Sequence, residues 1–299
     1  MIGVDLGGTK IAAGAIDRRG AVTAGTERPT PTASQYELLT ALDELIEQIQ
    51  EQVGCVEALG FGIPSTIDQR SGRAVSSVHV PLADLDFRER MIERFELPVA
   101  IDNDGNAAAI AEWKLGAGAG ARDMIMLTLG TGIGGGLILD GRPYRGSVGA
   151  GAELGHMVLK YDGPPCQGTC PGRGHFEVLV SGTAADAVAR SVVSPEATGR
   201  DLVRLAAGGD APATEALAGL GRILGAGLAS LVNVFNPEVI VLGGGFGEAG
   251  ELLFEPAREL VAREALSPGR DLVRIVPAEL GAEAGLIGAG LIAFEALDR

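Results

Sequence analysis

The stretch LTLGTGIGGGLILDGRPYRGSVGAGAELGH, residues 127–156, decides how the rest of the chain is interpreted. It begins with an apolar run that predicts a strand, passes through a glycine-rich turn, and continues with a second apolar run at residues 137–140. The glycines of the turn are Gly130, Gly132, Gly134, Gly135 and Gly136. Glycine permits positive φ angles and lets backbone N–H groups approach a ligand closely, so this predicted hairpin suits a phosphate clamp.

Two other interpretations of this hairpin remain open. Gly130, Gly132 and Gly135 satisfy the GxGxxG pattern of dinucleotide-binding folds, but that pattern requires a helix after the turn, and here a strand follows. Alternatively, the glycines serve only the tightness of the turn.

The N-terminus repeats the design of strand, glycine turn and strand, with apolar runs at Ile2–Leu6 and residues 11–16. The turn between them, a second candidate phosphate clamp, is Gly7, Gly8, Thr9 and Lys10. It is not a P-loop, which needs Gly-Lys-Ser/Thr before a helix. Asp5, at the end of the first run, could help to hold Mg²⁺ through water, because that ion dehydrates reluctantly, or could only cap the turn.

Composition predicts a large, soluble globular protein. The chain has 299 residues, enough for about two domains, and 46% of them are apolar. The 24 Lys and Arg against 39 Asp and Glu give a net charge of −15, which disfavours nonspecific binding to nucleic acid or to an anionic membrane. The first residues contain no basic region followed by a long apolar stretch, so we expect neither a signal peptide nor a membrane span, and a cytoplasmic location.

Helical and strand periodicities alternate along the chain. They predict helices at residues 36–53, 82–96, 213–235, 252–265 and 283–296, and strands at residues 56–63, 99–101, 239–242 and 272–276. The strand at residues 239–242 runs into Gly243, Gly244 and Gly245, where the backbone could approach the adenosine part of a nucleotide or simply turn.

The strand that ends at residue 101 leads into Asp102, Asn103, Asp104, Gly105 and Asn106. Strong helix formers follow, so Asn103 and Asp104 lie near a helix N-terminus at the carboxyl end of a strand, where open α/β sheets bind ligands. Asp104 could act as a general base for a hydroxyl group that Asn103 fixes by hydrogen bonding, or one of the two could merely cap the helix.

Cysteine and histidine cluster near the end of the glycine-rich region. Cys166, Cys170, His175 and the upstream His156 supply four ligands for a closed tetrahedral site, which predicts structural zinc. A disulfide between Cys166 and Cys170 is the alternative, disfavoured by a reducing cytosol.

Taken together, these motifs resemble the ROK family of bacterial sugar kinases, in particular its glucokinases, within the actin and hexokinase-like superfamily. The resemblance extends over essentially the whole chain, and its segments follow in the expected order. These segments are DLGGTK at residues 5–10, NDGNA at 103–107, GTGIGG at 130–135, ELGH at 153–156, the Cys/His cluster, and GGG at 243–245.

The resemblance implies two ribonuclease-H-like α/β domains around a central cleft: residues 1–112 joined by the C-terminal helix 283–299, and residues 113–282 with the zinc-binding loop. It implies that Asp104 is the base for the sugar 6-hydroxyl, and that Mg²⁺-ATP is the phosphoryl donor, held at the two glycine turns, which include Thr131. It further implies a homodimer. The implied sugar-hydroxyl contacts are Asn103, Glu153, His156 and Glu177, so His156 would both contact the sugar and bind zinc, through different ring nitrogens.

The chain departs from the family pattern at two places. Cys166 and Cys170 are separated by three residues where many members have CxC, and His175 stands where a cysteine is expected. His79 stands where relatives often carry a sugar-contacting asparagine, which leaves the preferred hexose open among glucose, mannose, fructose, allose and N-acetylmannosamine. The donor, ATP or polyphosphate, also remains open. A sugar-sensing regulator or a sugar-binding module without catalysis is the alternative outside enzymes.

Overall fold

The computed structural model describes residues 1–77, 80–168 and 170–297. His79, at which the sequence leaves the sugar preference open, lies outside the described residues.

The first half of the chain builds a five-stranded sheet in the order β3-β2-β1-β4-β7. The strands are β1 (Ile2–Leu6), β2 (Lys10–Ile16), β3 (Val22–Pro29), β4 (Leu59–Ile63) and β7 (Val99–Asn103). Strands β1, β2 and β3 form an antiparallel meander, whereas β1, β4 and β7 run parallel. Helices α1 (Gln35–Val53) and α2 (Phe87–Phe95) bury their apolar residues against this sheet, and β5 (Thr66–Asp68) pairs with β6 (Arg73–Ser76) in a small separate hairpin.

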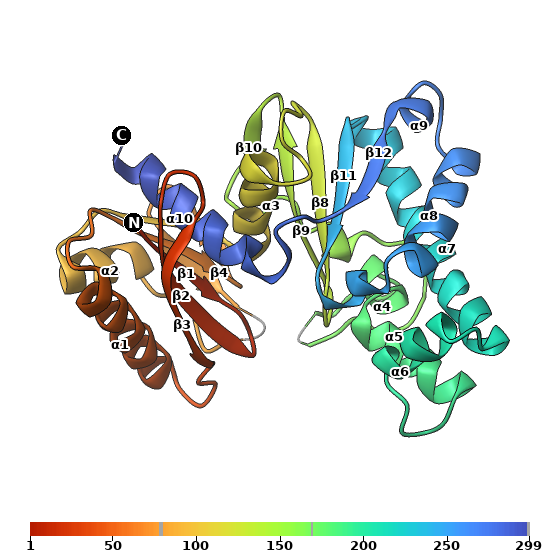
Figure 1. Ribbon diagram of the computed structural model, residues 1–299, viewed down its shortest axis with the longest axis horizontal. Helices are drawn as coiled ribbons and strands as arrows, with labels where there is room; N and C mark the ends of the chain where they lie inside the picture. Colours follow the sequence, from red (N-terminus) through yellow and green to blue (C-terminus); the bar gives the residue numbers. More distant parts are fainter. Residues whose placement is uncertain (78–79, 169, 298–299) are drawn as a thin grey trace.

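The second half repeats the same topology in the order β10-β9-β8-β11-β12. The strands are β8 (Met124–Leu129), β9 (Ile133–Leu139), β10 (Arg142–Tyr144), β11 (Val239–Gly243) and β12 (Arg274–Pro277). Again the first three are antiparallel and the last two add in parallel to β8. Two sheets with one strand order confirm the predicted pair of ribonuclease-H-like halves (Figure 1).

Most helices of the second half lie on the outer side of its sheet (Figure 1). They are α4 (Phe176–Leu179), α5 (Gly182–Val192), α6 (Gly199–Ala207), α7 (Ala211–Phe235), α8 (Glu251–Glu264) and α9 (Gly269–Leu272), with short 3₁₀ turns η1 (Leu154–His156), η2 (Gly245–Ala249) and η3 (Gly281–Glu283). Among helices in the described ranges, only α7 is long and apolar enough to cross a membrane, and 56% of its most apolar window is buried inside the protein. Its leucines, Leu217, Leu220, Leu224, Leu228 and Leu231, belong to the core of this half.

Helices α3 (Asp104–Leu115) and α10 (Ala284–Leu297) lie between the two sheets and against each other (Figure 1). Helix α3 follows β7 of the first sheet but packs on β8 and β9 of the second, whereas α10 follows β12 of the second sheet and packs on β1, β4 and β7 of the first. Glycines allow α10 to pack so closely on β4 and on α3. A Cβ on Gly60 would come within 1.8 Å of the Ala289 carbonyl oxygen, and a Cβ on Gly288 would come within 1.8 Å of the Ala107 carbonyl oxygen.

A buried carboxylate joins α3 to the segment that leads into α10. Glu112 has no exposed surface, and its oxygens accept hydrogen bonds from the backbone N–H groups of Ala117 (2.9 Å), Glu279 (3.2 Å) and Leu280 (2.7 Å). The predicted domain boundary at residue 112 therefore falls within a helix that contacts both sheets, and the boundary stays a prediction.

Several sequence expectations about elements were wrong. The strand expected from residue 56 begins only at Leu59, and the strand expected from residue 272 begins at Arg274, because Leu272 belongs to α9. Residues 82–86 are not helical, because α2 begins only at Phe87. More importantly, Gly134, Gly135 and Gly136 lie inside strand β9 and not in the turn, which consists of Gly130, Thr131 and Gly132.

Candidate active site between the two sheets

Strand β7 ends at Asn103 and α3 begins at Asp104, as the sequence indicates. The Asn103 side chain caps the helix, because its Oδ1 accepts from the N–H groups of Gly105 (2.9 Å) and Asn106 (3.4 Å). The capping interpretation therefore applies to Asn103, whose Nδ2 remains the atom suited to a ligand. Asp104 occupies the first turn, where the helix dipole favours a carboxylate.

The glycines of β9 bring this helix N-terminus onto the hairpin. A Cβ on Gly105 would lie 2.6 Å from the carbonyl oxygen of Gly135, and a Cβ on Gly136 would lie 2.5 Å from the Cβ of Ala109. Distances this short exclude larger side chains, so these glycines are needed for the approach of α3. They thereby place Asp104 beside the turn formed by residues 130–132.

A cavity of about 310 Å³ opens at this junction. It gathers all the predicted sugar contacts from separate parts of the chain, together with residues of the glycine hairpin. Its lining comprises Pro64, Ser65, Thr66, Ser76, Ser77, Asn103, Asp104, Thr128, Gly130, Thr131, Gly132, Ile133, Gly134, Gly135, Gly151, Ala152, Glu153, His156 and Glu177. Among these described residues there are three carboxylates and neither lysine nor arginine, which suits a neutral polyhydroxyl ligand held by hydrogen bonds.

The pKa values of two carboxyl groups in and near the cavity, Glu153 and Asp5, are raised. Burial raises the pKa of Glu153, with the negative charges of Asp104 and Glu177 adding to the effect and His156 opposing it. Burial and the neighbouring Asp104 carboxylate raise the pKa of Asp5 to about 7, against the opposing charge of Lys10. Asp5 thus lies close enough to Asp104 for the two charges to interact, and a bound cation would relieve their repulsion.

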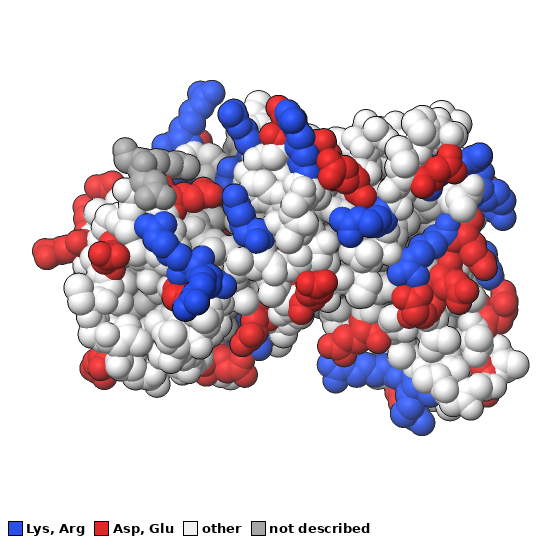
Figure 2. Space-filling model, turned by 45° about the horizontal axis from the view of Figure 1, so that its top comes forward, with Lys and Arg blue, Asp and Glu red and all other residues white. Residues whose placement is uncertain are grey.

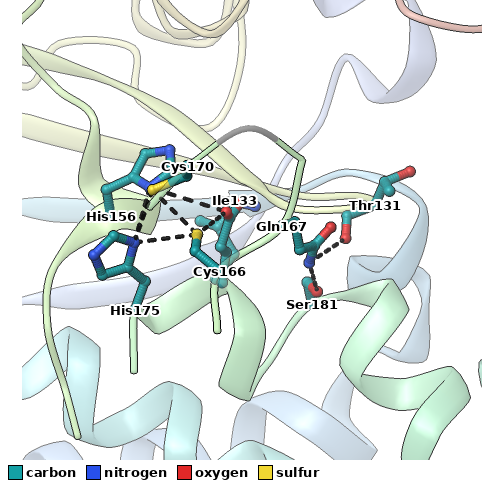
Figure 3. A network of polar contacts seen from close by, with 9 residues as sticks. Thr131, Ile133, His156, Cys166, Gln167, Cys170, His175 and Ser181 are labelled. Carbon is teal, nitrogen blue, oxygen red and sulfur yellow. Dashed lines mark hydrogen bonds and ion pairs between the residues drawn. The ribbon is translucent and has the colours of Figure 1, made fainter. Parts of the chain in front are cut away.

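The predicted metal ligands converge on one point (Figure 3). The Nδ1 atoms of His156 and His175 lie 3.0 Å apart, the Cys166 Sγ lies 3.7 Å from His156 Nδ1 and 3.2 Å from His175 Nδ1, and the Cys170 Sγ lies 3.8 and 3.7 Å from the same two nitrogens. Zinc bonds of about 2.0 Å to nitrogen and about 2.3 Å to sulfur give tetrahedral edges of roughly 3.3–3.8 Å. The four donors therefore fit a tetrahedral zinc ion, and both cysteines are free thiols, contrary to the disulfide alternative.

Glu177 connects this cluster to the glycine hairpin. Its Oε1 lies 3.1 Å from Cys166 Sγ, while its Oε2 accepts from the Ile133 N–H group at 3.3 Å. Gly132 leaves room for this carboxylate, since a Cβ there would lie 2.3 Å from Oε2 and the Glu177 side chain would have to move. His156 offers Nδ1 to the cluster and also lines the cavity, which leaves its Nε2 for a ligand there.

A second cavity of about 560 Å³ adjoins the first and shares Gly130 and Thr131 with it. Its other lining residues are Gly182, Thr183, Asp186, Gly199, Arg200, Val203, Arg204, Gly245, Phe246, Glu248 and Ala249. The Thr131 carbonyl accepts from Thr183 Oγ1 at 2.8 Å, and Gln167 Nε2 bridges it to Ser181 Oγ, with both contacts at 3.3 Å (Figure 3). The size and position of this cavity suit a nucleotide whose phosphates reach the hairpin.

The glycines of the third turn, residues 243–245, have different roles. Gly245 lines the second cavity, but Gly243 and Gly244 are absent from its lining. Gly244 has a φ of 83°, and a Cβ there would lie 2.5 Å from the Leu129 carbonyl oxygen, so it serves the packing of β11 against β8.

The first glycine turn lies outside the linings of both cavities. Gly8, Thr9 and Lys10 are exposed, Gly7 donates its N–H to the Lys10 carbonyl at 2.9 Å, and Lys10 pairs with Glu27 at 2.7 Å. Its part in phosphate binding stays a prediction.

Sequence reasoning missed the arginines and Thr183 of the second cavity. Arg200 and Arg204 belong to an amphipathic helix, α6, whose capping box of Thr198 and Asp201 indicates a helix start but no ligand. The only signal near Thr183 is Ser181, a helix cap before α5.

Two α/β halves of one topology, with a helix-borne aspartate at a glycine hairpin between two adjoining cavities, are the architecture of the hexokinase-like class of proteins. The chain belongs to the ROK family, whose model matches residues 1–296. It is 34% identical to the glucokinase of Streptomyces coelicolor over an alignment of 316 positions, which covers 98% of this chain and 97% of that protein.

Solved structures of this family superpose on the whole chain. A ROK family glucokinase from Streptomyces griseus in complex with glucose and AMPPNP is 33% identical, with a TM-score of 0.86 and 99% of each chain covered. A ROK hexokinase from Thermus thermophilus is 38% identical, with a TM-score of 0.84, covering 100% of this chain and 99% of that one.

Proposed function

We propose that this protein is a glucokinase, which transfers the γ-phosphoryl group of ATP to the 6-hydroxyl of glucose. The observation that carries the proposal is the junction at Gly130 and Thr131, where the cavity that holds Asp104 meets the cavity suited to a nucleotide. Similarity to glucokinases over nearly the full chain supports both the donor and the acceptor.

In this reaction Asp104 accepts the proton of the sugar 6-hydroxyl as the oxygen attacks the γ-phosphorus, and the bond from that phosphorus to the β,γ-bridging oxygen breaks to release ADP. The Nδ2 of Asn103 and the carboxylates of Glu153 and Glu177 are placed to orient the sugar hydroxyls. Backbone N–H groups of the turn at residues 130–132 are available to the phosphates. A Mg²⁺ ion near Asp5 would offset the phosphate charge when bound.

Exclusion of water matters because water competes with the sugar hydroxyl for the phosphoryl group. Helices α3 and α10 join the two sheets and are the elements about which the halves could close.

We assign structural zinc to His156, Cys166, Cys170 and His175. Four protein ligands leave no open position for catalysis, so the ion would act by fixing the ring of His156 at the edge of the sugar cavity.

We also infer a cytoplasmic homodimer without nucleic-acid partners. Figure 2 shows Lys and Arg side chains interspersed with Asp and Glu on the face in view, and the net charge is −15. Light scattering on the purified protein would test the dimer.

The test is ADP release from Mg²⁺-ATP against a panel of hexoses, with a no-sugar control and the position of the phosphate determined. Strong dependence on glucose with phosphate at C6 would support a glucokinase. Preference for mannose, fructose, allose or N-acetylmannosamine would keep the chemistry and change the substrate, whereas activity only with polyphosphate would change the donor. No turnover with any sugar and donor, together with sugar binding, would favour a sugar sensor.

A further inference from the structure

A nearly buried ion pair joins the two halves of the protein beside the candidate catalytic residues. Arg145 follows β10 in the second sheet, and its Nε and Nη2 both lie 2.6 Å from Oδ2 of Asp102, in β7 of the first sheet. The side chain of Asp102 is 1% exposed and that of Arg145 is 23% exposed. Charge-assisted contacts of this kind fix geometry as well as adding attraction.

The other oxygen of Asp102 organises the first turn of α3. Oδ1 accepts from the backbone N–H of Asn103 at 2.9 Å, from Asn106 Nδ2 at 2.9 Å and from Gln69 Nε2 at 3.4 Å. Arg145 therefore fixes the position of the Asp102 carboxylate. That carboxylate in turn fixes the helix turn that contains Asn103 and Asp104.

Arg145 also begins a loop, residues 145–151, that crosses to the first half; we call this loop the strap. The strap is closed by the Gly151 N–H, which donates to the Arg145 carbonyl at 2.9 Å. Its tip, Gly149, has a φ of 84° and lies so close to β5 that a Cβ would come within 1.8 Å of the Ile67 carbonyl oxygen. Directly after the strap come Ala152, Glu153 and His156, which line the sugar cavity.

We propose that Arg145 is a positioning residue for phosphoryl transfer: its ion pair with Asp102 aligns the turn that carries Asp104 with the sugar-binding loop that follows the strap. This inference rests on the proposed sugar kinase activity. A merely structural ion pair would affect folding alone, whereas a positioning residue affects kcat and the KM for the sugar but not the KM for ATP. The nucleotide cavity contains no residue of the strap.

The surroundings of Arg145 also permit chemical rescue. A cavity of about 260 Å³ adjoins the ion pair, and Asp102, Arg145, Gln69 and Glu295 are among its lining residues. Removal of the arginine side chain would connect this space to the Asp102 carboxylate, so that a small guanidinium ion could bind there in its place.

The experiment compares wild type, Arg145→Ala, the double variant Asp102→Asn/Arg145→Ala and a matched control, Arg90→Ala. Arg90 forms a similar forked pair with Asp43, at 2.5 and 2.6 Å, within the first half and remote from the cleft. The double variant removes both charges, so it avoids a buried unpaired carboxylate and keeps the test independent of a folding defect in Arg145→Ala.

For Arg145→Ala we expect a loss of about 10²-fold in kcat, a raised KM for glucose and a KM for ATP within about twofold of wild type. Millimolar guanidinium should restore part of the lost kcat in Arg145→Ala and none in Arg90→Ala. The double variant should unfold at the wild-type temperature or close to it, yet remain slow.

Wild-type kcat in Arg145→Ala or in the double variant would overturn the proposal, as would a folded Arg145→Ala that guanidinium does not rescue. A wild-type protein that phosphorylates no hexose would instead refute the proposed function, and this inference with it.

Discussion

The pKa of Asp5 makes the stability of the ligand-free protein depend on pH in an unusual direction. Burial and the nearby Asp104 carboxylate raise the pKa of Asp5 from the usual 3.8 to about 7. The folded protein therefore keeps a proton on Asp5 at pH values where the unfolded chain has lost it. At low pH this proton makes the free energy of unfolding larger. That additional stability is lost as the pH rises through 7.

The difference between the two pKa values corresponds to about 4 kcal/mol at ~1.36 kcal/mol per pH unit. Between pH 5.5 and 8.5, a range above the isoelectric point of about 4.7, the expected change is about half of that, ~2 kcal/mol. Asp5→Asn replaces the titrating group by a neutral side chain of the same shape. The variant should therefore lose this fall in stability and be more stable than wild type at pH 8.5.

The assay is urea unfolding of both proteins at several pH values in buffer without Mg²⁺ or nucleotide, with Asp271→Asn, at an exposed carboxylate, as control. The difference in unfolding free energy between Asp5→Asn and wild type should grow by ~2 kcal/mol from pH 5.5 to 8.5. Parallel curves for the two proteins would refute the reasoning, because Asp5 would then titrate alike in the folded and unfolded states.

Three further predictions concern the base, the metal cluster and the link between the halves. Asp104→Asn should bind glucose, measured by calorimetry, but lose at least about 10²-fold in kcat; normal turnover would remove Asp104 from the role of base. Removal of zinc by a chelator should lower the melting temperature and the affinity for glucose together, and a metal-free protein with full activity would contradict the zinc assignment. Glu112→Gln should cost ~1.5–3 kcal/mol in urea unfolding, because an amide cannot accept from all three N–H groups, whereas the exposed Glu283→Gln should cost little.

Sequence alone predicted the features that arise from local pattern. The glycine turns and the other short motifs carried the resemblance to the ROK family, which implied two ribonuclease-H-like halves; the family membership and the two sheet orders confirm both predictions. The spacing of Cys166, Cys170 and His175 was enough to anticipate the converging donors, because metal ligands in one short loop need little help from the rest of the fold.

Features that depend on packing between distant segments could not be predicted from the local sequence pattern. Gly135 and Gly136 looked like turn residues, but they serve the approach of α3, which only the folded chain reveals. Arg200 of the second cavity follows ordinary helical periodicity, and Arg145 is a single arginine in a glycine-rich loop whose partner lies 43 residues away. No local signal distinguishes such residues from solvent-exposed ones.

The exchange of α3 and α10 between the sheets has a consequence for how the chain is made. Because α10 begins only at Ala284, the strands β1, β4 and β7 acquire the helix that covers them only after the whole second sheet has been translated. Until α10 has left the ribosome, the face of the first sheet that α10 covers stays open to water and to other chains. The N-terminal half is thus translated first and finished last, and a chain that stops before residue 284 should be a substrate for chaperones instead of a folded domain.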